Sequence, residues 1–249
     1  MGKLEGQVAL ITGASSGMGR ATALAFAEEG AKLAIAARRQ GALEELATTL
    51  QQKGAEVIWQ ATDVSKLGDV EAIVRATVER FGRLDVLVNA AGINAPNRTM
   101  KVMTPELWDR IINTNLNGAF HCTHAVLPQM RRQQGGTIIH ITSVSGKWGD
   151  ISGAAYQASK HGMVGLSYGT MFEERENGIR MTLIFPGLCN TEILRNRQVP
   201  FSREMLDKMM KPEDIAAACV FAAGLPSRTY VAEIVMMPGA LQCVGHAAV

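Results

Sequence analysis

Short runs of apolar residues alternate with longer amphipathic segments along the chain. Within most short runs the apolar side chains occupy successive positions, which is typical of strands buried on both faces of a parallel sheet. These runs predict strands at residues 7–12, 32–37, 56–62, 85–91, 137–142, 180–186 and 232–237. The segments between them predict helices at residues 18–29, 41–53, 69–81, 105–133, 155–176 and 212–223.

This order of elements predicts a doubly wound, parallel α/β sheet with right-handed crossovers. No linker, repeat or low-complexity segment interrupts the 249 residues, so the pattern indicates one domain. We expect residues 1 to about 135 to form a cofactor half and residues 136–249 to form a catalytic and substrate half. Within the second half, residues 191–211 are expected to form a lid over the pocket.

Charge and cysteine content exclude several classes of protein. The net charge of +2 comes from charges of both signs spread along the chain, which argues against a nucleic-acid binder. The apolar run at residues 8–11 is too short for a membrane span or signal peptide. His121 and His124 lack a third ligand nearby in sequence, so no metal site is predicted. No cysteine pair has metal-ligand spacing, and a reduced, cytoplasmic compartment is the simplest interpretation. The cysteines are Cys122, Cys189, Cys219 and Cys243.

A glycine-rich turn follows the first predicted strand. Gly13, Gly17 and Gly19 have the spacing G-x-x-x-G-x-G and precede a predicted helix. Glycines there allow a ligand to approach the backbone, and the free N–H groups of the helix N-terminus can bind a pyrophosphate. The alternative is a tight turn of small residues without a ligand, and the position within the first βαβ unit favours the nucleotide.

The end of the second predicted strand bears on the choice of cofactor. In this class of fold an acidic residue there accepts hydrogen bonds from the adenosine ribose. Here Arg38 and Arg39 follow the strand, and a guanidinium matches a 2′-phosphate. We therefore expect NADP(H), with NAD(H) possible; the alternative is a solvated pair of arginines. Asp63 and Asn89 end the third and fourth strands and are candidates for binding the adenosine side.

Three residues suggest proton transfer. Tyr156 and Lys160 are four residues apart on a predicted helix and so share a face. An ammonium nearby favours the phenolate and lowers the tyrosine pKa. Ser143 follows the fifth strand, at the sheet edge where ligands bind, and can hold a carbonyl or hydroxyl oxygen. Tyrosine and lysine at this spacing are common on helices, so the pair gains meaning only beside the glycine-rich turn and Ser143.

Taken together, these motifs resemble the short-chain dehydrogenase/reductase family of about 250 residues. The resemblance covers nearly the whole chain and rests on residues 12–19, 89–92, 113–118, Ser143, 156–160 and 186–191. It implies a sheet order of 3-2-1-4-5-6-7 and catalytic roles for Ser143, Tyr156 and Lys160. It also implies that Asn115 holds a water in a proton relay. The implied cofactor-binding residues are Gly13, Ser15, Ser16, Gly17, Met18, Gly19, Arg38, Arg39, Asp63, Val64, Asn89, Ala90, Ala91, Gly92, Tyr156, Lys160, Pro186, Gly187, Leu188 and Thr191.

The resemblance further implies a homotetramer or homodimer that pairs through the helices at 105–133 and 155–176. The chain departs from the family pattern at Ala90, where a second asparagine is usual. The C-terminal segment at 230–249 also lacks the Asp-Gly-Gly ending of many acyl-carrier reductases, which favours members acting on small hydroxy acids or ketones.

Loops at the same sheet edge provide candidate substrate contacts. They are Ser143, Ser145, Trp148, Tyr156, Leu188 and Cys189, with Asn94 nearby. The expected lid is basic and could attract an acidic substrate or a carrier protein, although a solvated helix face explains it more simply. Its basic residues are Arg195, Arg197, Arg203, Lys208 and Lys211.

The sequence thus predicts an enzyme that interconverts a ketone or aldehyde and an alcohol by NADP(H)-dependent hydride transfer, with Tyr156 as general acid/base. A 3-oxoacyl reductase acting on an acyl-carrier or CoA substrate is an alternative within the family. A regulator that senses NADP(H) without turnover is an alternative of another class. The presence of both Tyr156 and Lys160 favours the enzyme.

Overall fold

A seven-stranded parallel sheet forms the centre of the computed structural model, which describes residues 2–195 and 200–241. The strand order is β3-β2-β1-β4-β5-β6-β7, and every neighbouring pair is parallel. This confirms the predicted fold class and order, and each strand begins and ends within two residues of its prediction. The strands are β1 (Val8–Thr12), β2 (Lys32–Ala37), β3 (Val57–Ala61), β4 (Val86–Asn89), β5 (Gly136–Ile141), β6 (Ile179–Pro186) and β7 (Glu233–Met236).

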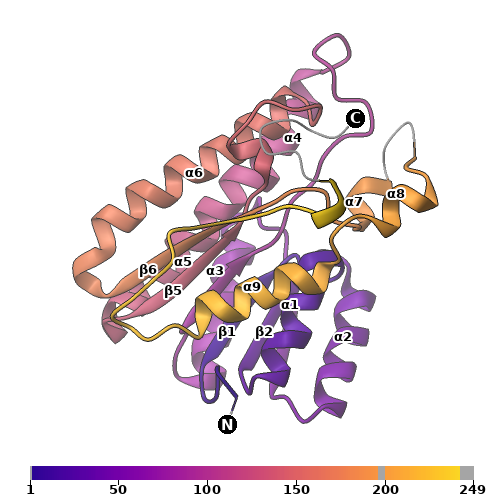
Figure 1. Cartoon of the computed structure of the whole chain (residues 1–249). Helices are drawn as coiled ribbons and strands as arrows, with labels where there is room; N and C mark the ends of the chain where they lie inside the picture. The colour runs from indigo at the N-terminus through magenta and orange to yellow at the C-terminus, as the bar shows by residue number, and fades with distance from the viewer. Residues whose placement is uncertain (1, 196–199, 242–249) are drawn as a thin grey trace.

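Helices cover both faces of the sheet, as Figure 1 shows. One layer holds α1, α2 and α9, and the other holds α3, α5 and α6. Their bounds are α1 (Gly17–Glu28), α2 (Gln40–Gln52), α3 (Leu67–Phe81), α4 (Pro105–Ile112), α5 (Gly118–Gln133), α6 (Ala154–Glu174) and α9 (Pro212–Ala223). The short helices α7 (Glu192–Arg195) and α8 (Arg203–Asp207) lie between β6 and α9.

Two hydrophobic cores lie on the two sides of the sheet. Ile11 of β1 and Phe26 of α1 belong to the core beneath α1, α2 and α9. Leu10, the neighbour of Ile11, instead packs with Ile73 of α3 and Val126 of α5 in the other core. Because successive strand residues point to opposite faces, the central strands must be apolar at every position. This explains the continuous apolar runs that identify the strands in the sequence.

The helix predicted at 105–133 is interrupted. Thr104 caps α4 by accepting a hydrogen bond from the Leu107 N–H, and a π-helical turn at Asn113–Asn117 then separates α4 from α5. Within this turn the side chain of Asn115 is fully buried and bonds to the backbone of Ile93. The predicted bounds of 105–133 are confirmed, but the π-helical turn was not predicted, because apolar periodicity carries no signal for a local widening that aims one polar side chain inward.

The segment predicted to be a lid contains α7 and α8, and Arg197 lies outside the described residues. Arg203, Lys208 and Lys211 are exposed, and Lys208 pairs with Glu204 on α8 at 2.6 Å. None of these three residues lines either of the two cavities at the carboxyl edge of the sheet, which favours the solvated interpretation of their charge. In the part of the chain that the structure describes, no helix has the length and apolar character needed to cross a bilayer.

Candidate active site

The turn between β1 and α1 packs tightly against the end of β4. A Cβ on Gly13 would lie 2.7 Å from the Ala91 nitrogen, and a Cβ on Gly19 would lie 2.5 Å from the Gly13 oxygen. Gly13 and Gly17 also have φ angles of +66° and +54°, which disfavour other residues. The glycines therefore bring the backbone close to β4 and open the N-terminus of α1 towards the cleft above it.

A cleft of about 510 Å³ runs along the carboxyl edge of the sheet from this turn to α6. The structure brings most of the predicted cofactor-binding residues together along it. Those that line it are Gly13, Ser15, Ser16, Gly17, Met18, Gly19, Arg38, Arg39, Asp63, Val64, Ala90, Ala91, Gly92, Tyr156, Lys160 and Thr191. Pro186, Gly187 and Leu188 line a second, adjoining cavity instead.

Two exposed guanidiniums lie at the far end of the cleft. Arg39 donates to the Ser15 hydroxyl and carbonyl at 3.3 and 3.2 Å, and to the Glu192 carboxylate at 3.1 Å. Burial alone would raise the pKa of Asp63, but hydrogen bonds from Ser65 and the charges of Arg38 and Lys66 hold this pKa below its usual value. The second-strand end is therefore cationic, and Asp63 is an ionised acceptor beside it.

Asn89 lines neither cavity, unlike the other predicted cofactor-binding residues, and its role at the cofactor stays a prediction. Its side chain is only 3% exposed, points away from the cleft and contacts the ring of buried His140 at 3.3 Å. His140 also contacts Thr123 and Ser167, and burial, together with the charge of Lys160, lowers its pKa to about 3. Because side chains alternate along a strand, Asn89 at the end of β4 faces the helix layer of α3, α5 and α6. The sequence motif alone does not show which face the side chain takes.

Ser143, Tyr156 and Lys160 meet where the two cavities join. Tyr156 lines both cavities and is hydrogen-bonded to Ser143, which follows β5. Lys160 is 3% exposed, donates to the Ile141 carbonyl at 3.1 Å and places its Nζ 5.6 Å from the centre of the Tyr156 ring. The predicted trio is thus assembled from the end of β5 and the first two turns of α6.

Burial changes the predicted electrostatics of this trio. Burial raises the pKa of Tyr156 to about 12. The hydrogen bond with Ser143 lowers this pKa, the charge of Asp150 raises it further, and the charge of Arg98 lowers it. Burial also lowers the pKa of Lys160 to about 8. Burial thus dominates the pKa of Tyr156, and the expectation that Lys160 lowers this pKa stays a prediction.

Asn115 holds the loop after β4 against α6. Its amide donates to the Ile93 carbonyl and the Ser159 hydroxyl, each at 3.0 Å, and its Oδ1 accepts from the Ile93 N–H at 2.8 Å. Both amide hydrogens are thus committed to protein acceptors, so within the side chain only a lone pair on Oδ1 is left for the predicted relay water. The residue positions α6, and with it Tyr156 and Lys160.

The second cavity, of about 140 Å³, lies beside Ser143 and Tyr156. It brings together the remaining predicted substrate residues: Asn94, Ser145, Trp148, Leu188 and Cys189. Two charged residues that the sequence reasoning missed, Arg98 and Asp150, also line it. They come from irregular loops, where neither periodicity nor a recognised motif marks a residue.

Comparison with known proteins identifies this arrangement, since residues 7–200 match the model of the family described as short chain dehydrogenase. The chain belongs to the short-chain dehydrogenase family. A 3-oxoacyl-[acyl-carrier-protein] reductase of Thermotoga maritima is 34% identical to it, over 96% of this chain and 99% of that protein. This protein is therefore an oxidoreductase with the NAD(P)-binding Rossmann fold of its family.

Solved structures agree with the short-chain dehydrogenase assignment. Levodione reductase superposes with a TM-score of 0.88 at 32% identity, covering 95% of this chain and 98% of its own. An alcohol dehydrogenase from the archaeon Thermococcus sibiricus, complexed with 5-hydroxy-NADP, gives a TM-score of 0.86 at 30% identity, covering 96% and 99%.

One departure from the short-chain dehydrogenase pattern can now be located. Ala90, where a second asparagine is usual, lines the cleft, and its N–H donates to the Thr12 hydroxyl at 3.2 Å. The Oδ1 of the neighbouring Asn89 is buried and has no partner among the described residues. The side-chain amide of Asn89, the asparagine that the motif keeps, therefore uses only part of its hydrogen-bonding capacity.

Proposed function

We propose that this protein is an NADP(H)-dependent oxidoreductase that interconverts a ketone or aldehyde carbonyl and an alcohol. One observation carries the proposal: Tyr156 lines both the cofactor cleft and the smaller cavity, with Ser143 and Lys160 beside it. A substrate oxygen in the smaller cavity would therefore meet the phenol at the point where the long cleft ends. Proton transfer and hydride transfer could then occur at neighbouring atoms.

The cleft residues fit a dinucleotide. A Cβ on Gly13 would meet the backbone of Ala90 and Ala91, so only glycine permits the close turn that opens the α1 N-terminus to a pyrophosphate. A nicotinamide bound near Tyr156 would supply or accept the hydride. We infer that Pro186, Gly187 and Thr191 flank the nicotinamide, because Thr191 lines both cavities and the other two residues line the smaller one.

In the reductive direction, Tyr156 would donate its proton to the carbonyl oxygen as hydride reaches the carbonyl carbon, which gives the alcohol. In the oxidative direction the phenolate would remove that proton. Ser143 would hold the same oxygen, and Lys160 would stabilise the phenolate when its ammonium is protonated. With its pKa raised to about 12, Tyr156 carries the phenolic proton at neutral pH and can act as the proton donor in the reductive direction.

Arg38 and Arg39 support NADP(H) over NAD(H) because no carboxylate ends β2 and both guanidiniums line the cleft. The test is Arg38→Ala, with NADPH and NADH binding followed by fluorescence titration. We expect NADPH affinity to fall by about 10- to 100-fold, as for loss of a charge-assisted contact, while NADH affinity changes by less than about threefold. An equal loss for both nucleotides would contradict the phosphate assignment.

A 3-oxoacyl reductase is the second candidate, supported by the similarity to the Thermotoga maritima reductase. The decisive experiment titrates the purified chain with NADPH and then measures turnover of 3-oxoacyl thioesters and of small ketones and aldehydes by cofactor absorbance. Turnover of a carbonyl substrate supports the enzyme, and the preferred group separates the two candidates. Tight NADPH binding without turnover of any carbonyl in either group would favour a sensor.

We also infer a homo-oligomer, a tetramer or a dimer, that pairs through α4, α5 and α6. Three aromatic side chains, Phe120, Tyr168 and Phe172, are 46%, 44% and 71% exposed on this helix layer. The inference that the protein works in a reducing cytoplasm draws support from the three described cysteines, which are all buried and free.

A further inference from the structure

The substrate cavity holds a carboxylate that the catalytic trio does not use. Asp150 lies in the loop between β5 and α6, is half-buried and lines the cavity. Its Oδ1 accepts from the Ser152 N–H at 2.7 Å, and its Oδ2 accepts from the Ser145 hydroxyl at 2.5 Å. These contacts fix the position of the carboxylate inside the cavity.

Asp150 is close to the reacting groups. The Ser145 hydroxyl that donates to it lies 3.1 Å from the Ser143 hydroxyl, so the carboxylate is two hydrogen bonds away from Ser143. Its charge also acts on Tyr156, whose pKa it raises. A substituent on the carbon next to a carbonyl held by Ser143 and Tyr156 would therefore be within reach of this carboxylate.

The carboxylate keeps capacity to bind a substrate. An ionised carboxylate offers about four lone-pair sites and no hydrogen to donate. Two of these lone pairs accept the hydrogen bonds from the Ser145 hydroxyl and the Ser152 N–H. The others can accept a hydrogen bond from a molecule in the cavity that Asp150 lines. A plain alkyl group placed there would desolvate a charge without compensation, which is costly.

The charge balance of the cavity favours a neutral donor. Arg98 lines the same cavity and acts on Tyr156 in the sense opposite to Asp150. The backbone and side chain of Arg98 pack against Gly153, where a Cβ would lie 2.6 Å from the Arg98 oxygen, so the two loops are in close contact. With one cation and one anion at the wall, a hydroxyl suits the site better than an ammonium, which Arg98 would repel.

The other side of the cavity is apolar. Leu188, Cys189, Ile193 and Leu194 come from the chain after β6, and Met237 and Pro238 come from the chain after β7. This wall provides no charge and suits a short alkyl substituent. The cavity wall thus offers a substrate a charged, polar part at Arg98 and Asp150 and an apolar part after β6 and β7.

We propose that Asp150 is a substrate-binding residue and that the substrate is a small hydroxyketone, with the corresponding vicinal diol as product. The hydroxyl on the carbon next to the carbonyl donates to Asp150, and the alkyl group on the other side contacts the apolar wall. The proposal rests on the proposed carbonyl reduction, which it deepens by naming the substrate class. It sets this protein apart from a reductase of long acyl chains, which bring no such donor.

The test compares two ketones that differ in one hydroxyl, 3-hydroxy-2-butanone and 2-butanone, with NADPH as the reductant. For the wild-type chain we expect kcat/KM to be at least about tenfold higher for the hydroxyketone, as for one hydrogen bond to a charged group. Asp150→Ala should lower this ratio by at least about tenfold. Asp109→Ala removes an exposed carboxylate on α4 and serves as the matched control, with an unchanged ratio.

A second variant separates substrate binding from an indirect effect on Ser143. Ser145→Ala removes the hydroxyl that links Asp150 to Ser143 but keeps the carboxylate, which the Ser152 N–H still holds, so the ratio should persist. If Ser145→Ala lowers the ratio as much as Asp150→Ala does, Asp150 acts through Ser143, and the substrate assignment is overturned. Asp150→Asn keeps the shape and one acceptor oxygen, and an intermediate ratio is expected; this variant serves if the alanine variant fails to fold.

A binding measurement provides the second readout. Calorimetric titration of the protein loaded with NADP⁺ should show tighter binding of 2,3-butanediol than of 2-butanol, and Asp150→Ala should abolish the difference. Equal turnover of both ketones by the wild type would overturn the hydroxyketone assignment while leaving carbonyl reduction intact. Absence of turnover for every ketone, aldehyde and thioester, together with no binding of either alcohol, would overturn both.

Discussion

At the scale of single residues, Lys160 illustrates a conflict between function and stability. Its ammonium is buried, and burial lowers its pKa from 10.5 to about 8. Below pH 8 the folded and unfolded chains both carry the proton, so the full cost of burying the charge is present there. Between pH 8 and 10.5 the unfolded chain binds more protons than the folded one, so stability rises with pH and this cost disappears.

Lys160→Met should therefore stabilise the fold at pH 7 by on the order of 1–3 kcal/mol, because a chain of similar length replaces a buried charge. The gain over the wild type should shrink as the pH rises from 8 to 10.5. Urea denaturation at pH 7 and pH 10 measures both effects, and the exposed Lys101→Met serves as the control. A less stable variant at pH 7 would show that the hydrogen bond from Lys160 to Ile141 outweighs desolvation.

Tyr156→Phe tests the proposed acid/base directly. Loss of the phenol should lower kcat by about 10²- to 10⁴-fold, which is the usual contribution of a general acid. NADPH affinity should stay within about threefold, because the ring and the cleft are retained. Tyr168→Phe, three turns further along α6 and 44% exposed, is a matched substitution that should keep full activity. Normal turnover in Tyr156→Phe would refute the role of the phenol.

How far the sequence predicts a residue depends on what surrounds that residue. Ser143, Tyr156 and Lys160 follow from a motif with fixed spacing, and the structure brings them together at one junction. Asn89 belongs to an equally clear motif, yet its side chain turns inward to His140 because of strand alternation. The pKa values could not be predicted either, since they depend on burial that spacing does not report.

At the scale of elements, an ion pair joins the ends of α5 and α6. Arg131 donates from Nε to Glu174 at 3.0 Å, and Asn177 donates to the same carboxylate at 2.9 Å. Glu174 is only 2% exposed. The hydrogen bond from Arg131, against the opposing effect of burial, lowers the pKa of Glu174 below 4.5. Its contribution to stability is therefore fully present above pH 4.5 and is lost as the pH falls through the lowered pKa.

Glu174→Gln keeps the shape but removes the charge, so we expect a loss of about 1–3 kcal/mol in unfolding free energy at pH 7. The difference from the wild type should narrow as the pH falls below 4.5. Urea denaturation at pH 7 and pH 4 measures it. Glu173→Gln alters the exposed neighbour and should change stability by less than about 0.5 kcal/mol. A constant difference across this pH range would rule out the carboxylate as its source.

Elements were more predictable than the details within them. Continuous apolar runs locate the strands because both faces of the sheet are covered, and the helices between them follow from amphipathic spacing. The π-helical turn at Asn113–Asn117 was missed since its cause lies in a contact with Ile93, far from it in sequence. The segment predicted to be a lid contains the short helices α7 and α8, which the hydrophobic pattern of the sequence does not predict.

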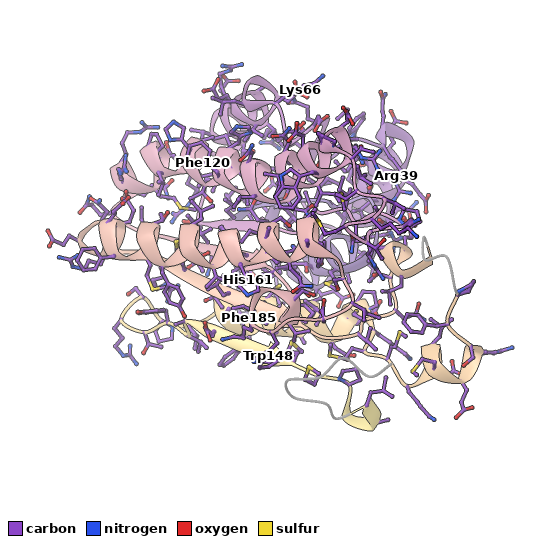
Figure 2. All side chains as sticks on the ribbon, turned by 90° about the horizontal axis from the view of Figure 1, so that it is seen from above. Arg39, Lys66, Phe120, Trp148, His161 and Phe185 are labelled. Atoms are coloured by element: carbon purple, nitrogen blue, oxygen red, sulfur yellow. The ribbon has the colours of Figure 1, made fainter. Side chains whose placement is uncertain are left out.

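At the scale of the whole molecule, exposed aromatic and apolar side chains lie on helices α5 and α6 and around the sheet edge at β7. The helix patch consists of Phe120 on α5 with Tyr168 and Phe172 on α6. Figure 2 shows Phe120 on α5 and His161 on α6, the two neighbouring helices that carry this patch. The edge patch consists of Phe221 on α9, Tyr230 in the segment before β7, and Val235 on β7, which are 50%, 50% and 43% exposed.

Two separate patches of this kind would suit two different two-fold interfaces, which together would generate the tetramer that we propose. We expect light scattering after size exclusion to give four times the 26.8 kDa chain mass. Phe172→Asp should disrupt the helix patch and leave dimers that pair through the edge patch, whereas Val235→Asp should leave dimers that pair through the helix patch. A charge buried in an interface without a partner is costly enough to prevent association.

The masses discriminate between the possible assemblies. A wild-type mass of two chains, reduced to one by Phe172→Asp and unaffected by Val235→Asp, would establish the homodimer through α5 and α6. Loss of association in Val235→Asp alone would move the interface to the sheet edge and contradict the predicted pairing helices. The exposed Glu45→Ala, which lies on α2 in the opposite helix layer, should keep the wild-type mass. A wild-type monomer at micromolar concentration would show that both patches are solvated.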